Sequence, residues 1–268
     1  MKRLLLVAAI TTLLAGCATT TSPTGRRQVV GGVSEEQLAQ LGAQAFAETK
    51  AKTPQSTDAR QSAYVRCVVQ RVVAQLPPDW QNIGWETAVF VDNSPNAFAL
   101  PGGKVGVNTG IFTVAKNQDQ LATVIAHEVG HVYSHHHNER ITKQMGTQGL
   151  LQVAGALAGA RYGQGVGNAV VQGGGIAAQA GFLLPNSREQ ESEADVVGQQ
   201  LMARAGFDPR QAVNLWQNMI AASGGRSPEW LSTHPNPETR IRELNSRAAS
   251  LVPVFEQARA SGHTPKCG

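Results

Sequence analysis

Apolar residues recur at helical spacing in two segments of the N-terminal half of the chain. Residues 34–50 have the pattern of one amphipathic helix. A second predicted helix is marked by apolar residues three or four positions apart: Val65, Val68, Val69, Val72, Val73 and Leu76. Pro77 and Pro78 follow this pattern directly, and proline is poorly tolerated inside a helix because its nitrogen has no hydrogen to donate. We therefore predict two helices, the second ending before Pro77.

The hydrophobic period then changes to that of a small sheet. Residues 85–91 alternate between apolar and polar positions, as a half-buried strand does. Residues 96–100 and 104–108 flank Pro101-Gly102-Gly103, which is typical of a hairpin turn. Three short strands among helices predict an α+β fold that is mainly helical with a small β-sheet.

The C-terminal part of the chain is predicted to close the fold with two helices. Asp208-Pro209 and Asn236-Pro237 each combine a capping residue with a proline, which favours a helix start. The first of these helices is expected to place Leu215, Trp216, Met219 and Ile220 in the core. Residues 146–184 are rich in glycine and alanine, and their pattern leaves open a cover over the cleft or a packed helical hairpin.

The strongest chemical signal lies on a third predicted helix, which starts at a capping box of Asn117 and Gln120 and continues through His135. This helix carries His127-Glu128-Val129-Gly130-His131. Histidines four positions apart lie one helical turn apart, so both imidazoles can bind one zinc ion. Glu128 is placed to accept a proton from water without binding the metal. The motif alone is also compatible with ordinary helix residues, so a third ligand is needed.

One candidate for the third ligand lies on the same helix. Ser134 and His137 continue the motif toward a pattern in which a third histidine follows a glycine turn. Serine replaces that glycine here, and serine resists the left-handed conformation that brings the third histidine to the metal. We keep His137 as the minor alternative.

The second candidate lies on an acidic helix farther along the chain. Ser187 and Gln190 form a capping box, which places Glu191 in the first turn and Asp195 one turn later on the same face. Glu191 can then bind the metal, and Asp195 can accept the outer N–H of a zinc-binding histidine. A solvated acidic helix is the alternative. The combination of the two helices favours a zinc site of His127, His131 and Glu191, with one ion per chain.

The N-terminus has the pattern of an exported lipoprotein. Lys2 and Arg3 precede an apolar run over residues 4–14, which is too short to span a bilayer and suits a signal peptide. The run ends in Leu-Ala-Gly-Cys17, which resembles a bacterial lipobox, so we expect cleavage after residue 16 and lipidation of Cys17. Residues 18–33 are predicted to form a tether, and residues 34–268 one catalytic domain. Ala18 after the cysteine resembles a signal for the outer membrane.

Charge and cysteine usage agree with this location. The formal charge of +4 falls to 4 − 2 = +2 when Lys2 and Arg3 are removed with the leader, and no basic run is present. We therefore predict no nucleic-acid partner. Once Cys17 is acylated, Cys67 and Cys267 remain, and two thiols in an oxidising compartment are expected to form a disulfide. Two free thiols are the alternative.

These motifs together resemble the HtpX and CAAX-prenyl-protease family of zinc metallopeptidases, in particular its periplasmic lipoproteins. The resemblance covers nearly all of the mature chain and rests on four stretches: His127-Glu128-x-x-His131, Glu191-x-x-Ala194-Asp195, Asn96-Ala97-Phe98-Ala99 before Pro101, and His234-Pro235-x-Pro237-x-x-Arg240. It implies a gluzincin-like domain in which an edge strand of the sheet lies beside the active-site helix. It also implies that Glu191 is the third zinc ligand.

The resemblance implies an endopeptidase that acts on unfolded or misassembled envelope proteins at the periplasmic face of the outer membrane of a Gram-negative bacterium. Glu128 is expected to be the general base, and the strand with Asn96, Ala97, Phe98 and Ala99 is expected to bind an extended substrate as an added edge strand. His234 is expected to face the cleft, either as an oxyanion donor, which we favour, or in the open zinc position. A latent or inactive assembly factor for outer-membrane proteins is the alternative function.

Overall fold

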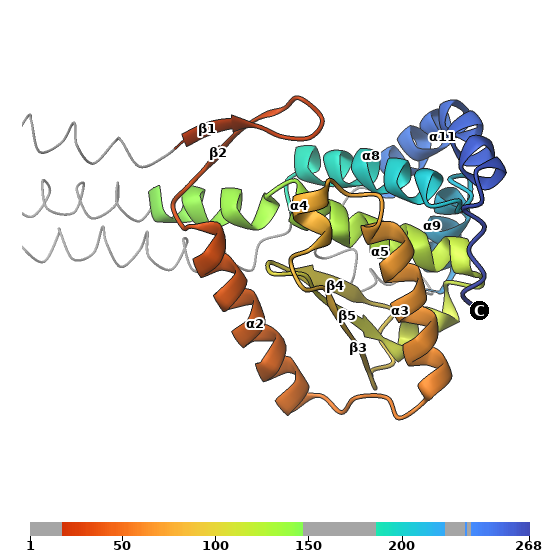
Figure 1. Cartoon of the computed structure of the whole chain (residues 1–268), viewed down its shortest axis with the longest axis horizontal. Helices are drawn as coiled ribbons and strands as arrows, with labels where there is room; N and C mark the ends of the chain where they lie inside the picture. The colour runs from red at the N-terminus through yellow and green to blue at the C-terminus, as the bar shows by residue number, and fades with distance from the viewer. Residues whose placement is uncertain (1–17, 147–185, 223–233, 235–236) are drawn as a thin grey trace, which may run out of the picture. The chain divides into compact units, whose positions relative to one another are not determined.

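The computed structural model describes residues 18–146, 186–222, 234 and 237–268 (Figure 1). The predicted signal peptide, the lipidation site Cys17 and nearly all of the Gly- and Ala-rich stretch 146–184 lie outside the described residues. The chain divides into two compact units. We call residues 1–35 with 135–184 the hairpin unit and residues 36–134 with 185–268 the core unit. Residues 135–146 thus group with the N-terminal segment, and one catalytic domain over residues 34–268 stays a prediction.

The hairpin unit contains two antiparallel strands, β1 (Ala18–Thr21) and β2 (Arg27–Val30), in the segment that we predicted to be a tether. The guanidinium of Arg26 donates two hydrogen bonds, of 3.0 and 2.8 Å, to the buried carboxylate of Glu139. The amide oxygen of Asn138 accepts from the backbone of Gly31 at 3.0 Å. These contacts hold the hairpin against a helical segment that starts at residue 136. The role of this segment as a tether stays a prediction.

The core unit contains the predicted sheet, with strands β3 (Glu86–Phe90), β4 (Ala97–Leu100) and β5 (Lys104–Asn108) in the order β3-β5-β4. β3 runs parallel to β5, and β4 runs antiparallel to it. Gly102 and Gly103 connect β4 to β5 with φ angles of 76° and 74°, which glycine adopts without strain. The predicted hairpin at this turn is therefore confirmed.

Six longer helices are described, besides the helical segment 136–146, the short helix α4 (Pro78–Gln81) and the 3-10 turn η2 (Thr109–Thr113). They are α2 (Glu35–Lys52), α3 (Ala59–Val73), α5 (Gln118–Tyr133), α8 (Arg188–Arg204), α9 (Gln211–Ala222) and α11 (Pro237–Ala260). No helix of the described part of the chain is long and apolar enough to cross a bilayer. The mainly helical fold with small sheets confirms the predicted fold class.

The sheet has helices on both faces. On one face Phe46 of α2 makes edge-on contacts with Phe90 and Phe98 at 6.1 and 6.3 Å between ring centroids. On the other face α3 and α5 bury the valines of β5 and the alanines of β4 in the main core. Figure 1 shows α5 between this sheet and α8. The helix α5 is buried along nearly its whole length. The edge strand β4 lies beside α5, as predicted.

Two sequence expectations about helices were wrong. α5 ends at Tyr133 rather than continuing through His135, because His135 adopts the left-handed φ of 56°, which a helix cannot include. Ile220 is 40% exposed, because the buried stripe of α9 follows Ala212, Leu215, Trp216 and Met219, and Ile220 lies just outside it.

Cys67 of α3 and Cys267 near the C-terminus form a disulfide, with their Cα atoms 5.5 Å apart. The backbone N–H of Cys267 also donates to the side chain of Gln118 at the start of α5. The two cysteines are 200 residues apart in the sequence, so the disulfide constrains most of the chain in the unfolded state.

We expect replacement of both Cys67 and Cys267 by alanine to lower the free energy of unfolding by roughly 2–5 kcal/mol, because a long loop is then released in the unfolded chain. Denaturant titration of the oxidised wild type and the double variant measures this difference. Wild-type protein in reductant is the matched control and should unfold like the variant. Mass spectrometry that finds both thiols free in protein from an oxidising compartment would contradict the assignment.

Candidate metal centre

The helix α5 presents both histidines of the sequence motif to one point. The side chain of Asn117 accepts from the backbone N–H of Gln120 and caps the helix, as predicted. The Nε2 atoms of His127 and His131 lie 3.0 Å apart, and both residues are 3% exposed. One helical turn between the residues is thus sufficient to bring the two ring nitrogens together.

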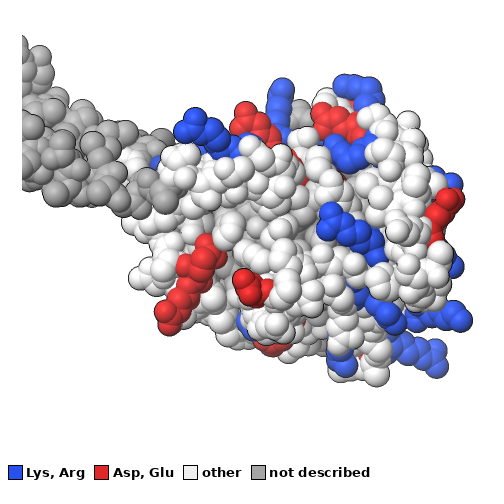
Figure 2. Space-filling view, turned by 45° about the horizontal axis from the view of Figure 1, so that its top comes forward, with Lys and Arg blue, Asp and Glu red and all other residues white. Residues whose placement is uncertain are grey.

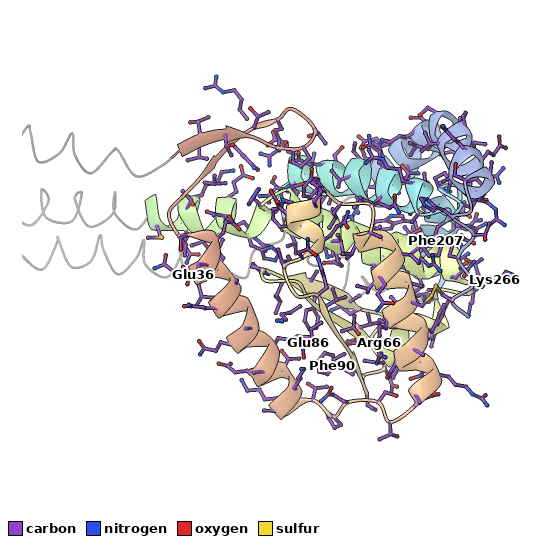
Figure 3. The ribbon with its side chains drawn as sticks, viewed as in Figure 1. Glu36, Arg66, Glu86, Phe90, Phe207 and Lys266 are labelled. Carbon is purple, nitrogen blue, oxygen red and sulfur yellow. A yellow bond between two sulfur atoms is a disulfide. The ribbon has the colours of Figure 1, made fainter. Side chains whose placement is uncertain are left out.

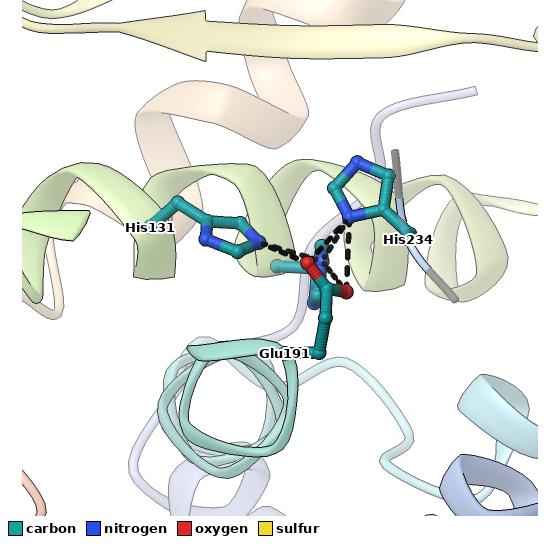
Figure 4. A group of neighbouring side chains, drawn as sticks. His131, Glu191 and His234 are labelled. Atoms are coloured by element: carbon teal, nitrogen blue, oxygen red, sulfur yellow. Dashed lines mark hydrogen bonds and ion pairs between the residues drawn. The ribbon is translucent and has the colours of Figure 1, made fainter. Parts of the chain in front are cut away.

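The helix α8 supplies the carboxylate. Ser187 and Gln190 form the predicted reciprocal capping box, which starts the helix just before Glu191. The two carboxylate oxygens of Glu191 lie 3.4 Å from His127 Nε2 and 3.4 Å from His131 Nε2. The predicted third ligand therefore lies within 3.4 Å of both histidines, and Figure 4 shows it beside His131.

Two glycines allow α5 and α8 to approach closely enough for this contact. A Cβ atom on Gly198 would lie 2.9 Å from the backbone nitrogen of His127, and one on Gly130 would lie 3.0 Å from the carbonyl oxygen of Ala194. Both distances are shorter than ordinary contacts. Neither glycine was predicted as a site residue, because neither carries a functional group.

His234 completes the group. Its Nδ1 lies 3.0 Å from both oxygens of Glu191 and 3.2 Å from His127 Nε2. Figure 4 shows His234 beside Glu191. Its Nε2 lies 3.4 Å from Oε1 of Glu128, which is also buried. One ligand atom from each of His127, His131, Glu191 and His234 falls within 4.8 Å of all the others. Among the described residues this is the one group of this kind.

A buried pair of charges orients the first histidine. Asp195 Oδ1 lies 3.0 Å from His127 Nδ1, and a carboxylate can only accept, so Nδ1 of the neutral ring carries the hydrogen and Nε2 keeps its lone pair. Arg240 donates two hydrogen bonds of 2.6 Å to Asp195 and forms an ion pair of 2.7 Å with Glu191. Its guanidinium also stacks over the ring of Trp216. Arg240 belongs to a motif of the sequence, but no role in the site was predicted for it.

The electrostatics favour a cation at this point. Burial and Arg240 lower the pKa of His127, but its bonds to Asp195 and Glu191 raise that pKa by more, to about 9. Burial raises the pKa of Glu191, whereas the neighbouring His234 and His131 and its hydrogen bonds lower it by more, to well below its usual range. With the histidines neutral, as metal binding requires, the carboxylates of Glu128, Glu191 and Asp195 against the guanidinium of Arg240 leave a net charge of −3 + 1 = −2, which a divalent cation balances.

The donor set and its spacing fit zinc. Imidazole nitrogens and a carboxylate oxygen are typical zinc ligands, and zinc–ligand distances of about 2.0–2.1 Å place tetrahedral ligand atoms about 3.3 Å apart. The separations between neighbouring ligand atoms here are 3.0–3.4 Å. His137, the alternative third ligand, does not belong to the group.

The residues of the predicted substrate strand point to two faces of the sheet. Ala97 and Ala99 are buried in the main core toward α5, whereas the ring of Phe98 packs in the aromatic cluster on the opposite face. That ring also covers Gly106, where a Cβ atom would lie 2.2 Å from it. The Phe98 side chain therefore has a packing role, and substrate binding by this strand stays a prediction.

The chain is similar in sequence to known proteins. The model of peptidase family M48 matches residues 59–248. The mitochondrial metalloendopeptidase OMA1 of Schizosaccharomyces pombe is 38% identical over 186 residues, which is 68% of this chain and 51% of the relative. The β-barrel assembly-enhancing protease of Escherichia coli is 28% identical over 225 residues, or 82% of this chain and 45% of the relative. The chain thus spans about half the length of these curated relatives.

The third ligand can be tested by metal content. We expect Glu191→Ala to lower zinc occupancy strongly and His137→Ala to leave it unchanged, because only Glu191 lies in the ligand group. Elemental analysis of both purified variants after dialysis against trace zinc measures the effect. Zinc lost from His137→Ala and kept by Glu191→Ala would show that the third ligand was misassigned.

Proposed function

Because the chain belongs to peptidase family M48, we propose that it is a zinc-dependent endopeptidase that hydrolyses unfolded or misassembled proteins. The observation that carries this proposal is the convergence of His127, His131 and Glu191 beside the buried carboxylate of Glu128. Both relatives named above carry protease or endopeptidase names, which supports the same class of activity.

Glu128 has the environment that a general base requires. It is 5% exposed, and its Oε1 accepts no hydrogen bond in the described part of the chain, so this oxygen is available for a proton. A zinc ion at the site supplies a Lewis acid that polarises water and the substrate carbonyl. Glu128 then takes the proton from the attacking water and passes it to the leaving amine, while Asp195 and Arg240 hold His127 in position.

The register of β4 supports binding of an extended substrate. The backbone N–H of Asn108 donates to the carbonyl of Asn96, so Asn96 faces β5 and the alternate residues Ala97 and Ala99 face the outer edge. The Asn96 side chain accepts from the Ala97 N–H, which leaves the Ala97 carbonyl and both backbone groups of Ala99 for a substrate strand. Ala97 and Ala99 are buried, so this edge must become accessible when a substrate binds.

We propose that the substrates are envelope proteins and that lipidated Cys17 holds the enzyme at the periplasmic face of the outer membrane of a Gram-negative bacterium. The lipobox-like sequence before Cys17 and the name of the E. coli relative support this location. The alternative, a latent enzyme or an inactive assembly factor, draws support from His234, whose ring nitrogen occupies the fourth place in the ligand group.

We expect Glu128→Gln to keep bound zinc and to lose about two to four orders of magnitude in peptide hydrolysis, because the amide cannot accept the proton of water. Zinc analysis and cleavage of unfolded casein measure both properties. Glu189→Gln, an exposed change of the same kind on α8, is the matched control and should behave like the wild type. Undiminished cleavage by Glu128→Gln would contradict the mechanism.

The two roles considered for His234 predict opposite effects of His234→Ala. Because Nδ1 of His234 lies 3.0 Å from Glu191 among the ligand atoms, the structure gives more support to a ligand at the open position than to the oxyanion donor that we favoured from sequence. We therefore expect His234→Ala to retain zinc and to cleave casein faster. A loss of roughly two to three orders of magnitude in turnover would instead support the oxyanion role.

A further inference from the structure

A groove of the core unit lies at the outer edge of β3, which is the sheet edge opposite β4. It has a volume of about 560 Å³ and is lined by one face of α3 and by the start of β3. Figure 3 labels Arg66 on α3 and Glu86 on β3, which both line it. Because β3 and β4 form the two outer strands of the order β3-β5-β4, this groove and the predicted substrate strand lie at opposite edges of one sheet.

The outer edge of β3 already accepts an extended segment over part of its length. The backbone N–H of Ser56 donates to the carbonyl of Val89, and the N–H of Val91 donates to the carbonyl of Pro54, both at 2.8 Å. Gln55 forms an antiparallel bridge with Phe90 between them. The edge thus has the geometry for antiparallel addition of a strand.

This pairing stops where the groove begins. The N–H of Glu86 donates to Gly103 at the β5 side, so the N–H and carbonyl of Thr87 point outward. Thr87 lines the groove, and among the described residues the outer edge of β3 is paired at the Gln55–Phe90 bridge and not at Thr87. An extended peptide in the groove can therefore form a pair of hydrogen bonds with Thr87.

The side chains of the groove indicate which peptide fits. Val69 and Val73 are buried apolar residues that form part of its wall. Glu86 is bound by Lys50 and by Lys104, the latter at 3.3 Å, so its charge is compensated. The side chain of Arg66 is exposed and makes no ion pair or hydrogen bond with any described residue. The groove therefore offers one uncompensated cation beside the strand edge, which complements a carboxylate.

We propose that this groove is a second peptide-binding site, which adds an extended segment carrying an acidic side chain to the edge of β3. The choice of an unfolded polypeptide as ligand rests on the proposed function. The site holds a part of the substrate chain that is remote from the scissile bond, with Thr87 forming main-chain hydrogen bonds and Arg66 pairing with the acidic side chain. Such a site selects long unfolded chains over short peptides.

Direct binding tests the site without requiring catalysis. Fluorescein-labelled octapeptides of the same β-prone sequence, with either one glutamate or one lysine at the central position, are titrated into the full-length Glu128→Gln protein. We expect the acidic peptide to bind more tightly than the basic one. Arg66→Glu should weaken the binding of the acidic peptide about fivefold, as for a partly exposed ion pair. Arg71→Glu, an exposed change on the same helix outside the groove, is the control and should have no effect.

Two further measurements separate this site from the metal centre. Thr87→Pro removes an outward-facing backbone N–H, which an edge strand tolerates. This variant is expected to weaken the binding of both peptides. In the wild-type background Arg66→Glu should raise KM for casein about fivefold and leave the cleavage of a short peptide unchanged. Equal binding of both peptides, or equal effects of Arg66→Glu and Arg71→Glu, would overturn the proposal. If Thr87→Pro does not fold, the comparison of Arg66→Glu with Arg71→Glu is the test. Absence of cleavage by the wild type would refute the proposed function but would leave the binding result standing.

Discussion

The close packing of α5 against α8 is the contact on which the rest of the site depends. The histidines belong to one helix and the carboxylate to the other, so the ligand group exists only when the two backbones nearly touch. Gly130 and Gly198 make this possible, because any side chain at either position would press on the backbone of the opposite helix. Burial of the α5 side chains between the sheet and α8 then stabilises the contact.

This packing brings several ionised groups into a dry interior, where each needs a partner. Arg240 serves two carboxylates at once, since it holds Asp195 by two hydrogen bonds and reaches Glu191 by an ion pair. The planar guanidinium suits this geometry, and lysine would lose the paired donation. Arg240 thus links the orientation of His127 to the position of Glu191, although it does not belong to the ligand group.

The sequence predicted the parts of the site that depend on local geometry. The spacing of His127 and His131, and the capping box that places Glu191 and Asp195 on one face of α8, follow from the helical repeat. Contacts between distant segments were less predictable. The left-handed residue His135, the glycine contacts and the double role of Arg240 arise from tertiary packing, which overrides the local pattern. Arg240 could be noticed in the sequence only as part of the motif around His234, and that motif does not indicate that Arg240 binds Asp195 and Glu191.

Binding of a cation and stability of the core are coupled by the same charges. Three carboxylates and one guanidinium lie around His127 at low exposure, and an uncompensated buried charge destabilises a folded protein. The raised pKa of His127 shows that these groups favour added positive charge at its ring, which either a proton or a metal ion supplies. Glu191 and both histidines would hold a metal ion together, whereas a proton occupies one nitrogen. The metal is therefore the better partner for this arrangement, and α8 is held against α5 most firmly when the ligand group is complete.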